Sequence, residues 1–147
     1  MLLDIQDLRV EVPEFDADGR ELVPEVLKGA EDGLKDMNMA FAEKTSFKRG
    51  ATDFSAQVSK MKASDCDTVV LGTIIRETIG TIGTARKMGW NPHFIGSSAA
   101  YTDLIHKLGG KAMDGLYAMH QVAVPYADDS SKNVRDWFAA YKGKFNE

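Results

Sequence analysis

Two short loops of small and hydroxyl-bearing residues are the part of this sequence best suited to binding chemistry. Residues 72–77 read Gly-Thr-Ile-Ile-Arg-Glu, and residues 96–101 read Gly-Ser-Ser-Ala-Ala-Tyr. Each loop follows an apolar run and precedes a helical pattern, so hydroxyl groups and free backbone N–H groups gather at a helix start. Such a site can hold a carboxylate or an amide. Plain helix capping explains the same residues equally well.

The other chemically versatile residues do not form a set that points to catalysis or metal binding. The histidines, His93, His106 and His120, lie far apart in the sequence and lack metal-ligand spacing. The single cysteine, Cys66, stands between two aspartates whose charges disfavour a nucleophilic thiolate, so we interpret it as structural. We therefore expect no catalytic residue, no metal site and no cofactor.

The glycine motifs also argue against an enzyme. The sequence contains neither a phosphate-binding loop nor a nucleophile elbow. Gly80 and Gly83 lie within a helical pattern rather than between a strand and a helix, so close helix packing is the expected reason for them. A small hydrolase or reductase is accordingly the least favoured hypothesis, although the fold class would permit one.

The composition is that of one soluble globular domain with no affinity for nucleic acid. The 147 residues are 44% apolar and 27% charged, and the formal net charge is -4. A chain of this length can bury a core, and a weakly acidic surface does not attract phosphate backbones. Asp4 and Asp7 interrupt the apolar stretch that a signal peptide would need, and no apolar run approaches the length of a membrane span.

Strand-like and helix-like patterns alternate along the chain. We expect strands at Leu8–Val12, residues 40–47, Thr68–Leu71, His93–Gly96 and residues 116–124. We expect helices at about residues 20–35, from a cap at Thr52 or Asp53 to about 64, at about 77–88 with Gly89 ending it, at 102–108, and after a cap within 128–131. The second helix should bury Phe54, Val58 and Met61, and the last carries Val134, Trp137, Phe138 and Tyr141.

This alternation predicts an α/β fold with three layers. Its centre is an open, mainly parallel sheet of about five strands with helices on both faces. Thr68–Leu71 is apolar or β-branched at every position, which is typical of a central strand buried on both faces. In such sheets ligands bind outside the carboxyl ends of the strands, which is where both loops lie.

Several ordered segments resemble a known family. They are residues 50–58 (Gly-Ala-Thr-Asp-Phe-Ser-Ala-Gln-Val), 67–72 (Asp-Thr-Val-Val-Leu-Gly), 85–90 (Ala-Arg-Lys-Met-Gly-Trp), 94–98 (Phe-Ile-Gly-Ser-Ser), 115–117, 125–126 and 134–145. Together they resemble the branched-chain amino acid (Leu/Ile/Val) type of periplasmic substrate-binding protein, over roughly residues 8–147. Each segment is a weak motif alone, and their collinear order makes the resemblance specific.

The resemblance implies a type I periplasmic-binding-protein fold, in which two α/β lobes are joined by three hinge strands and close around a small ligand. The match falls on the second, C-terminal lobe, so we expect residues 1–147 to form one lobe of a truncated receptor that lacks its first lobe, its signal peptide and the closing C-terminal segments. Residues 1–6 match nothing in the family, and residues 22–24 resemble a small insertion. The family implies a periplasmic location, whereas the missing signal peptide leaves a cytoplasmic location or a piece of a longer protein open.

By resemblance, the cleft residues come from the two loops already chosen. Residues 73–76 lie where the family places an aromatic or polar contact to the ligand, and Ser98 lies where amino-acid binders often place an acid for the ligand ammonium. Either Glu77 substitutes for that acid or the ligand has no amino group, and the ligand class spans amino acids, amides and organic acids. The expected ligand-binding residues are Thr73, Ile74, Ile75, Arg76, Glu77, Ser97, Ser98 and Tyr101.

Two functions from different classes follow. The first is the solute-binding component of an ABC transporter, whose partners are a small-molecule ligand and either the missing first lobe or a permease. The alternative is a ligand-free interaction or oligomerisation module derived from such a receptor. A lobe without its partner exposes hinge edges and a cleft face, so we also expect a homo-oligomer.

Overall fold

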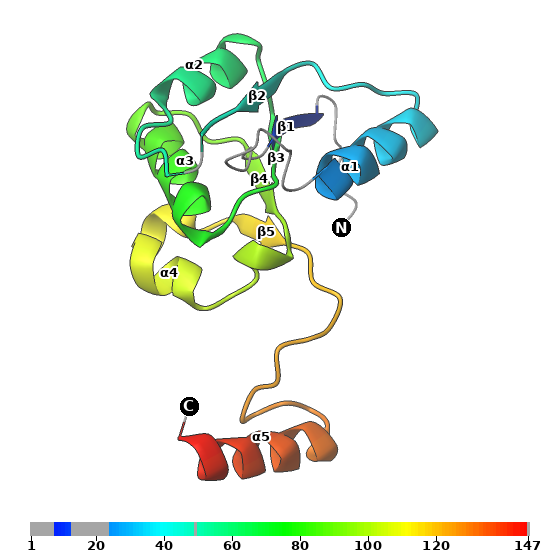
Figure 1. Cartoon of the computed structure of the whole chain (residues 1–147), viewed down its shortest axis with the longest axis vertical. Coiled ribbons are helices and arrows are strands. Elements are labelled where there is room, and N and C mark those ends of the chain that lie inside the picture. The colour runs from blue at the N-terminus through cyan, green and yellow to red at the C-terminus, as the bar shows by residue number, and fades with distance from the viewer. Residues whose placement is uncertain (1–7, 13–23, 49, 147) are drawn as a thin grey trace.

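A parallel sheet of five strands forms the centre of the molecule (Figure 1). The computed structural model describes residues 8–12, 24–48 and 50–146. The strands are β1 (Leu8–Val12), β2 (Lys44–Ser46), β3 (Thr68–Leu71), β4 (His93–Gly96) and β5 (Leu116–Ala118), and their spatial order is β2-β1-β3-β4-β5. Every neighbouring pair is parallel. The chain moves outward from β1 to β2, then returns to β3 on the other side of β1, so the strand order reverses between β1 and β3.

Helices cover both faces of the sheet, as the sequence pattern predicts. The helices are α1 (Pro24–Asp36), α2 (Ser55–Ala63), α3 (Ile75–Lys87), α4 (Leu104–Gly109) and α5 (Lys132–Phe145), with short 3₁₀ turns at η1 (Ser98–Ala100) and η2 (Gly110–Met113). Helices α2, α3 and α4 lie on one side of the sheet and α1 on the other, while α5 lies apart from the sheet at the end of an extended segment (Figure 1). None of the described helices is long and apolar enough to cross a membrane.

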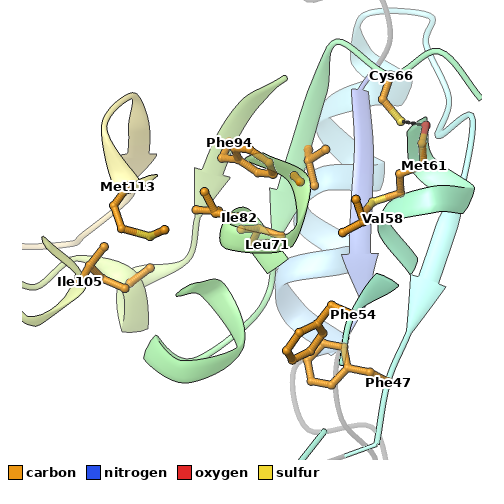
Figure 2. Packing of buried hydrophobic residues seen from close by; sticks show 13 residues of the cluster. Phe47, Phe54, Val58, Met61, Cys66, Leu71, Ile82, Phe94, Ile105 and Met113 are labelled. Atoms are coloured by element: carbon orange, nitrogen blue, oxygen red, sulfur yellow. Dashed lines mark hydrogen bonds between the residues drawn. The ribbon is translucent and has the colours of Figure 1, made fainter. Parts of the chain in front are cut away.

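The main core lies between the sheet and the layer formed by α2, α3 and α4. Figure 2 shows Phe54, Val58 and Met61 packed toward Leu71, Ile82 and Phe94. A smaller core on the α1 side contains Leu34 and Val70. All four residues of β3 are buried, since successive side chains of the strand enter opposite cores. The predicted central strand is therefore confirmed.

Local residue choices explain how the helices next to the sheet begin and end. The N-cap of α2 is Phe54, so the cap predicted at Thr52 or Asp53 is wrong by one or two positions. The Asp53 carboxylate still accepts a hydrogen bond from the Ser55 N–H at 2.9 Å, and hydrogen bonds from the side chain and the backbone of Ser55 lower the pKa of Asp53 below its usual value. Helix α3 ends before Gly89, which has a φ of 67°. The Cys66 thiol donates to the Met61 carbonyl at 2.8 Å within the core, which supports its structural interpretation.

Close packing explains one of the two glycines within α3. A Cβ added at Gly80 would lie 2.4 Å from Cε2 of Phe54, so α3 approaches α2 too closely there for any side chain. A Cβ added at Gly83 would meet nothing within 4 Å. The expectation of close helix packing is thus confirmed for Gly80 and wrong for Gly83.

Several predicted boundaries are wrong. Strand β2 is confined to Lys44–Ser46 instead of residues 40–47, and β5 to Leu116–Ala118 instead of residues 116–124. Hydrogen-bonded pairing with the neighbouring strand sets the length of both strands. Strand β2 pairs with β1 only at Lys44–Ser46, and β5 pairs with β4 only at Phe94–Gly96. Helix α4 begins at Leu104, two positions later than expected, and α3 begins at Ile75, so residues 75–77 form its first turn rather than a loop. The expected start of the first helix, near residue 20, lies outside the described residues.

Candidate ligand-binding site

The two predicted loops leave the sheet side by side. Strands β3 and β4 are neighbours, and Leu71 pairs with Gly96 at their carboxyl ends. The Ser97 N–H donates to the Leu71 carbonyl at 3.1 Å, and the Ser97 hydroxyl donates to the Thr73 carbonyl at 3.4 Å. These two hydrogen bonds connect the start of the loop after β4 to the end of β3 and to the loop that follows β3. The β3 loop also lies where the strand order reverses, which is the position that open α/β sheets use for ligands.

Thr73 turns its side chain into the protein. Thr73 is buried, and its hydroxyl oxygen lies 2.6 Å from the hydroxyl oxygen of Thr78, one turn into α3. This hydrogen bond fastens the loop to the first turn of the helix, where backbone N–H groups have no helical partner. Thr73 therefore supports the shape of the loop, and neither its hydroxyl nor its carbonyl lacks a partner, since the carbonyl accepts from the Ser97 hydroxyl. Ile74, which precedes the helix, is 45% exposed.

Arg76 and Glu77 form an ion pair whose two members differ sharply in exposure. The Glu77 side chain is 0% exposed and the Arg76 side chain is 60% exposed. Glu77 Oε1 accepts from Arg76 Nη2 at 2.6 Å and from Nε at 3.2 Å. Glu77 Oε2 has no hydrogen-bond partner among the described residues. The guanidinium is therefore accessible at the protein surface, whereas the carboxylate is not.

The second loop presents a hydroxyl and an aromatic ring. Ser98 opens the turn η1 with its side chain exposed, and Tyr101 ends the turn. The Tyr101 ring stacks on the His120 ring, with 5.0 Å between centroids and 9° between planes. His120 follows β5, and the neighbouring Met119 N–H donates to the Gly96 carbonyl at 3.1 Å. A third loop, after β5, therefore joins the other two at this edge.

The predicted residues do not share one cavity. Ser97 and Ser98 line a cavity of about 270 Å³ on the α1 side of the sheet, together with Val26, Met119, His120 and Gln121. Ile74, Ile75 and Arg76 line a wider groove on the α3 side. Tyr101 lines a third cavity beside α4, which Tyr126 also lines. Thr73 and Glu77 are buried.

The sequence prediction missed the third loop. Met119, His120 and Gln121 lay within the strand expected at 116–124, and a strand interior offers no reason to look for binding residues. The usable signal was the polar pair His120 and Gln121, which interrupts the apolar run of residues 116–124. Among the described residues, no group of three or more His, Cys, Asp or Glu side chains is arranged to hold a metal ion.

Comparisons with known proteins agree with this fold. The fatty acid ABC transporter substrate-binding protein from Thermomonospora curvata is 17% identical, with a TM-score of 0.78 over 96% of this chain and 35% of that chain. A putative branched-chain amino acid ABC transporter protein from Rhodospirillum rubrum is 16% identical, with a TM-score of 0.79 over 98% of this chain and 39% of that chain. A leucine-binding protein from Thermotoga maritima is 20% identical, with a TM-score of 0.74 over 95% of this chain and 38% of that chain.

These solved structures share the type I periplasmic-binding-protein fold, and the chain spans 35% to 39% of their own lengths. A search of curated proteins gives no match. A family model described as periplasmic binding protein matches residues 19–147. Since that match covers most of the sequence, the chain belongs to the periplasmic binding protein family, a family of solute-binding receptors.

Proposed function

We propose that this chain is one lobe of an ABC-transporter receptor of the branched-chain amino acid type, and that it binds a small solute at the carboxyl edge of its sheet. The observation that carries the proposal is the meeting of three loops, after β3, β4 and β5, at that edge. Their hydroxyl, amide and aromatic groups are suited to orienting a small polar molecule. The permease partner and the periplasmic location are part of the same proposal.

The shape of this edge supports half of a site rather than a whole one. The cavity around Ser97 and Ser98 is about 270 Å³, and Ser98, Met119, His120 and Gln121 around it are all exposed. Binding sites for small molecules usually enclose most of the ligand surface. The other wall is therefore assigned to a first lobe, which lies outside this chain. The chain covers only 35% of the Thermomonospora receptor, and this agrees with such a division.

The charges at this edge favour a neutral or anionic ligand group. None of the described residues that line the cavity around Ser97 and Ser98 is acidic. Glu77, the acid that could replace a carboxylate at Ser98, is buried and paired with Arg76. An α-ammonium group would here lack a charge-assisted bond typically worth roughly 1.5–3 kcal/mol. An amide or a carboxylate is the ligand group that fits this lobe, and the ammonium of an amino acid would need an acid from the other lobe.

Nuclear magnetic resonance tests this proposal on the chain as it is. Leucine, propionamide and benzoate are titrated separately into the ¹⁵N-labelled chain. We expect at least one of them to shift the amide signals of residues 97–98 and 119–121 saturably, while signals from α5 stay unchanged. If none of the three shifts these signals, the proposed binding edge is wrong. Saturable shifts confined to another surface would contradict the assignment equally.

A second candidate function, a homo-oligomeric interaction module, rests on helix α5. No residue of this helix is buried, and Trp137, Tyr141 and Phe145 lie on one side of it. The Trp137 ring stacks on the Tyr141 ring, with 5.2 Å between the ring centroids. Figure 1 shows the helix apart from the sheet and its covering helices. An isolated helix of 14 residues is marginal in water. Trp137 and Phe145 are 55% and 51% exposed, so a partner that covers them would stabilise the helix. A second copy of the chain would supply one.

Light scattering separates this candidate from the first. The oligomer hypothesis predicts a dimer or larger species for the chain, and a shift to monomer in Trp137→Ser/Tyr141→Ser. The matched control is Ala139→Ser, because Ala139 is exposed and lies on the opposite side of α5 from Trp137 and Tyr141. A monomer at every protein concentration would remove the oligomer hypothesis and leave the binding proposal untouched.

A further inference from the structure

We infer that the cavity beside α4 binds a small alkylated ammonium ion, with the Asp103 carboxylate as its counter-charge and the rings of Tyr101 and Tyr126 against its alkyl groups. The cavity has a volume of about 210 Å³. Its lining comes from the turn after β4, the first turn of α4, strand β5 and the segment that follows β5. The inference goes beyond the proposed function and does not depend on it.

This cavity is separate from the one around Ser97 and Ser98. Tyr101 lines the cavity beside α4 and His120 lines the other, and the two rings stack with 5.0 Å between their centroids. The stacked pair therefore lies between the two cavities. Since His120 covers one face of the Tyr101 ring, a ligand beside α4 meets the opposite face or the edge of that ring.

The Asp103 carboxylate makes few contacts within the described part of the chain. Asp103 precedes α4, but its side chain makes no capping hydrogen bond to the helix. None of the ion pairs between described residues includes it. The Tyr126 hydroxyl donates to its Oδ1 at 3.3 Å. A carboxylate can accept about four hydrogen bonds, so Asp103 retains the capacity and the charge to hold a cation.

The charge around the cavity favours a cation. Asp103 is the only acid among the described residues that line it, and no lysine or arginine does so. His106 also lines it, but Nε2 of His106 lies 3.9 Å from Oδ1 of Asp114, so that acid offsets a proton on the imidazole. The negative charge of Asp103 raises the pKa of Tyr126, because ionising the phenol would place two negative charges side by side.

The aromatic and aliphatic lining favours an alkylated cation over a bare metal ion. Tyr101 and Tyr126 are 37% and 45% exposed, and the faces of such rings attract cations. The aliphatic residues Ile105, Leu116 and Val124 also line the cavity and offer apolar contacts to methyl groups. A strongly hydrated metal ion would gain nothing from these contacts, whereas a quaternary ammonium ion uses both the charge and the apolar lining.

Titration of the ¹⁵N-labelled chain with choline and 3,3-dimethylbutan-1-ol tests the inference, because the two compounds have the same shape and differ by one charge. At constant ionic strength, we expect choline to shift the amides of residues 100–106 and 126 saturably. It should bind about tenfold more tightly than the neutral alcohol, and the anion 3,3-dimethylbutanoate should bind weakest. Equal dissociation constants for choline and the alcohol, or choline shifts confined to another surface, overturn the inference.

The role of the carboxylate is tested by Asp103→Asn, which keeps the shape of the side chain and an acceptor for the Tyr126 hydroxyl. Its preference for choline over the alcohol should fall by about fivefold. Asp128→Asn is the matched control, because Asp128 is exposed and close to Tyr126 in the sequence but does not line the cavity. The ¹⁵N spectrum verifies that both variants fold. An unchanged preference in folded Asp103→Asn overturns the assignment of Asp103.

The role of the aromatic ring is tested by a pair of variants at Tyr126. Tyr126→Phe keeps the ring and loses only the hydrogen bond to Asp103, so choline binding should stay within about twofold. Tyr126→Leu keeps apolar bulk and loses the ring, so it should weaken choline by about threefold and leave the alcohol unchanged. Equal choline binding by the two variants overturns the contribution of the ring.

The remaining outcomes separate this inference from the proposed function. If leucine, propionamide or benzoate shifts residues 97–98 while choline leaves the cavity beside α4 unchanged, the inference fails and the proposed function stands. If choline binds as expected and none of the three shifts residues 97–98 or 119–121, the inference stands and the proposed function fails.

Discussion

At the scale of single residues, the pairing of Arg76 with Glu77 sets the chemistry of the candidate site. A wholly buried carboxylate is costly unless it is paired and hydrogen-bonded. Glu77 meets this need through Oε1 alone, since Oε2 has no hydrogen-bond partner among the described residues. Arg76 therefore offsets the buried charge of Glu77, while its own side chain stays 60% exposed in the lining of the groove.

The first prediction concerns the stability of this pair. Arg76→Ala should lower the free energy of unfolding by about 1–3 kcal/mol, because it leaves the buried Glu77 charge without its partner. The double variant Arg76→Gln/Glu77→Gln should lose less, since no uncompensated charge remains. Urea unfolding followed by circular dichroism measures both. Equal stability of Arg76→Ala and the parent chain would mean that the ion pair has no structural role.

The second prediction concerns the hydroxyl at Ser98. Ser98→Asp places a carboxylate in the cavity that lacks one, so it should strengthen binding of leucine relative to 4-methylpentanoate, which has no amino group. A change of about tenfold in the ratio of the two dissociation constants is expected from one charge-assisted bond. Titration by nuclear magnetic resonance gives both constants, and Ser130→Asp, exposed in the segment before α5, is the control. A ratio that does not change would place Ser98 outside the ligand contact.

At the scale of elements, the close approach of α2 and α3 holds the β3 loop in position. Gly80 allows Phe54 to lie directly against α3, and Phe54 also packs edge-on against Phe47, with 5.3 Å between ring centroids. The start of α3 carries Ile75, Arg76 and Glu77, so any shift of the helix displaces the groove. The third prediction tests this contact.

Gly80→Ala should destabilise the chain by about 1–3 kcal/mol, because the added methyl group forces Phe54 or α3 to move. Gly83→Ala is the matched control on the same helix. Its methyl group meets nothing within 4 Å, so it should be neutral or stabilising by about 0.5–1 kcal/mol. Thermal unfolding of the two variants compares them directly. A stable Gly80→Ala variant would show that the two helices can separate at no cost.

The elements also indicate how far a sequence alone can be interpreted. The runs that form β3, β4 and α3 have strong patterns, and their existence was predicted correctly. Strand β5 was predicted too long, because pairing with the short β4 limits it and pairing is not visible in a local pattern. That error hid His120 and Gln121 from the predicted site. The burial of Glu77 could not be predicted from the sequence either. The buried face of α3 contains the polar residues Thr78 and Thr81, so no apolar stripe marks it.

At the scale of the whole molecule, the sheet and its helices form a body to which α5 does not belong. The helix and its aromatic residues were predicted from their spacing, but a spacing pattern does not say which surface an apolar face contacts. The open cavities at the carboxyl edge and the exposed rings of Trp137 and Phe145 on α5 are both consistent with a chain that spans 35% to 39% of its solved relatives. Both features fit a lobe that works together with another.

The affinity of the lone chain for small solutes tests this account most directly. Isothermal titration calorimetry with leucine, propionamide and benzoate measures it. One lobe covers only one side of a ligand, so we predict dissociation constants no tighter than about the millimolar range, near -4 kcal/mol. A nanomolar dissociation constant for any of these ligands would show that the chain forms a complete site by itself. It would contradict the proposal that the chain supplies only half of the binding site.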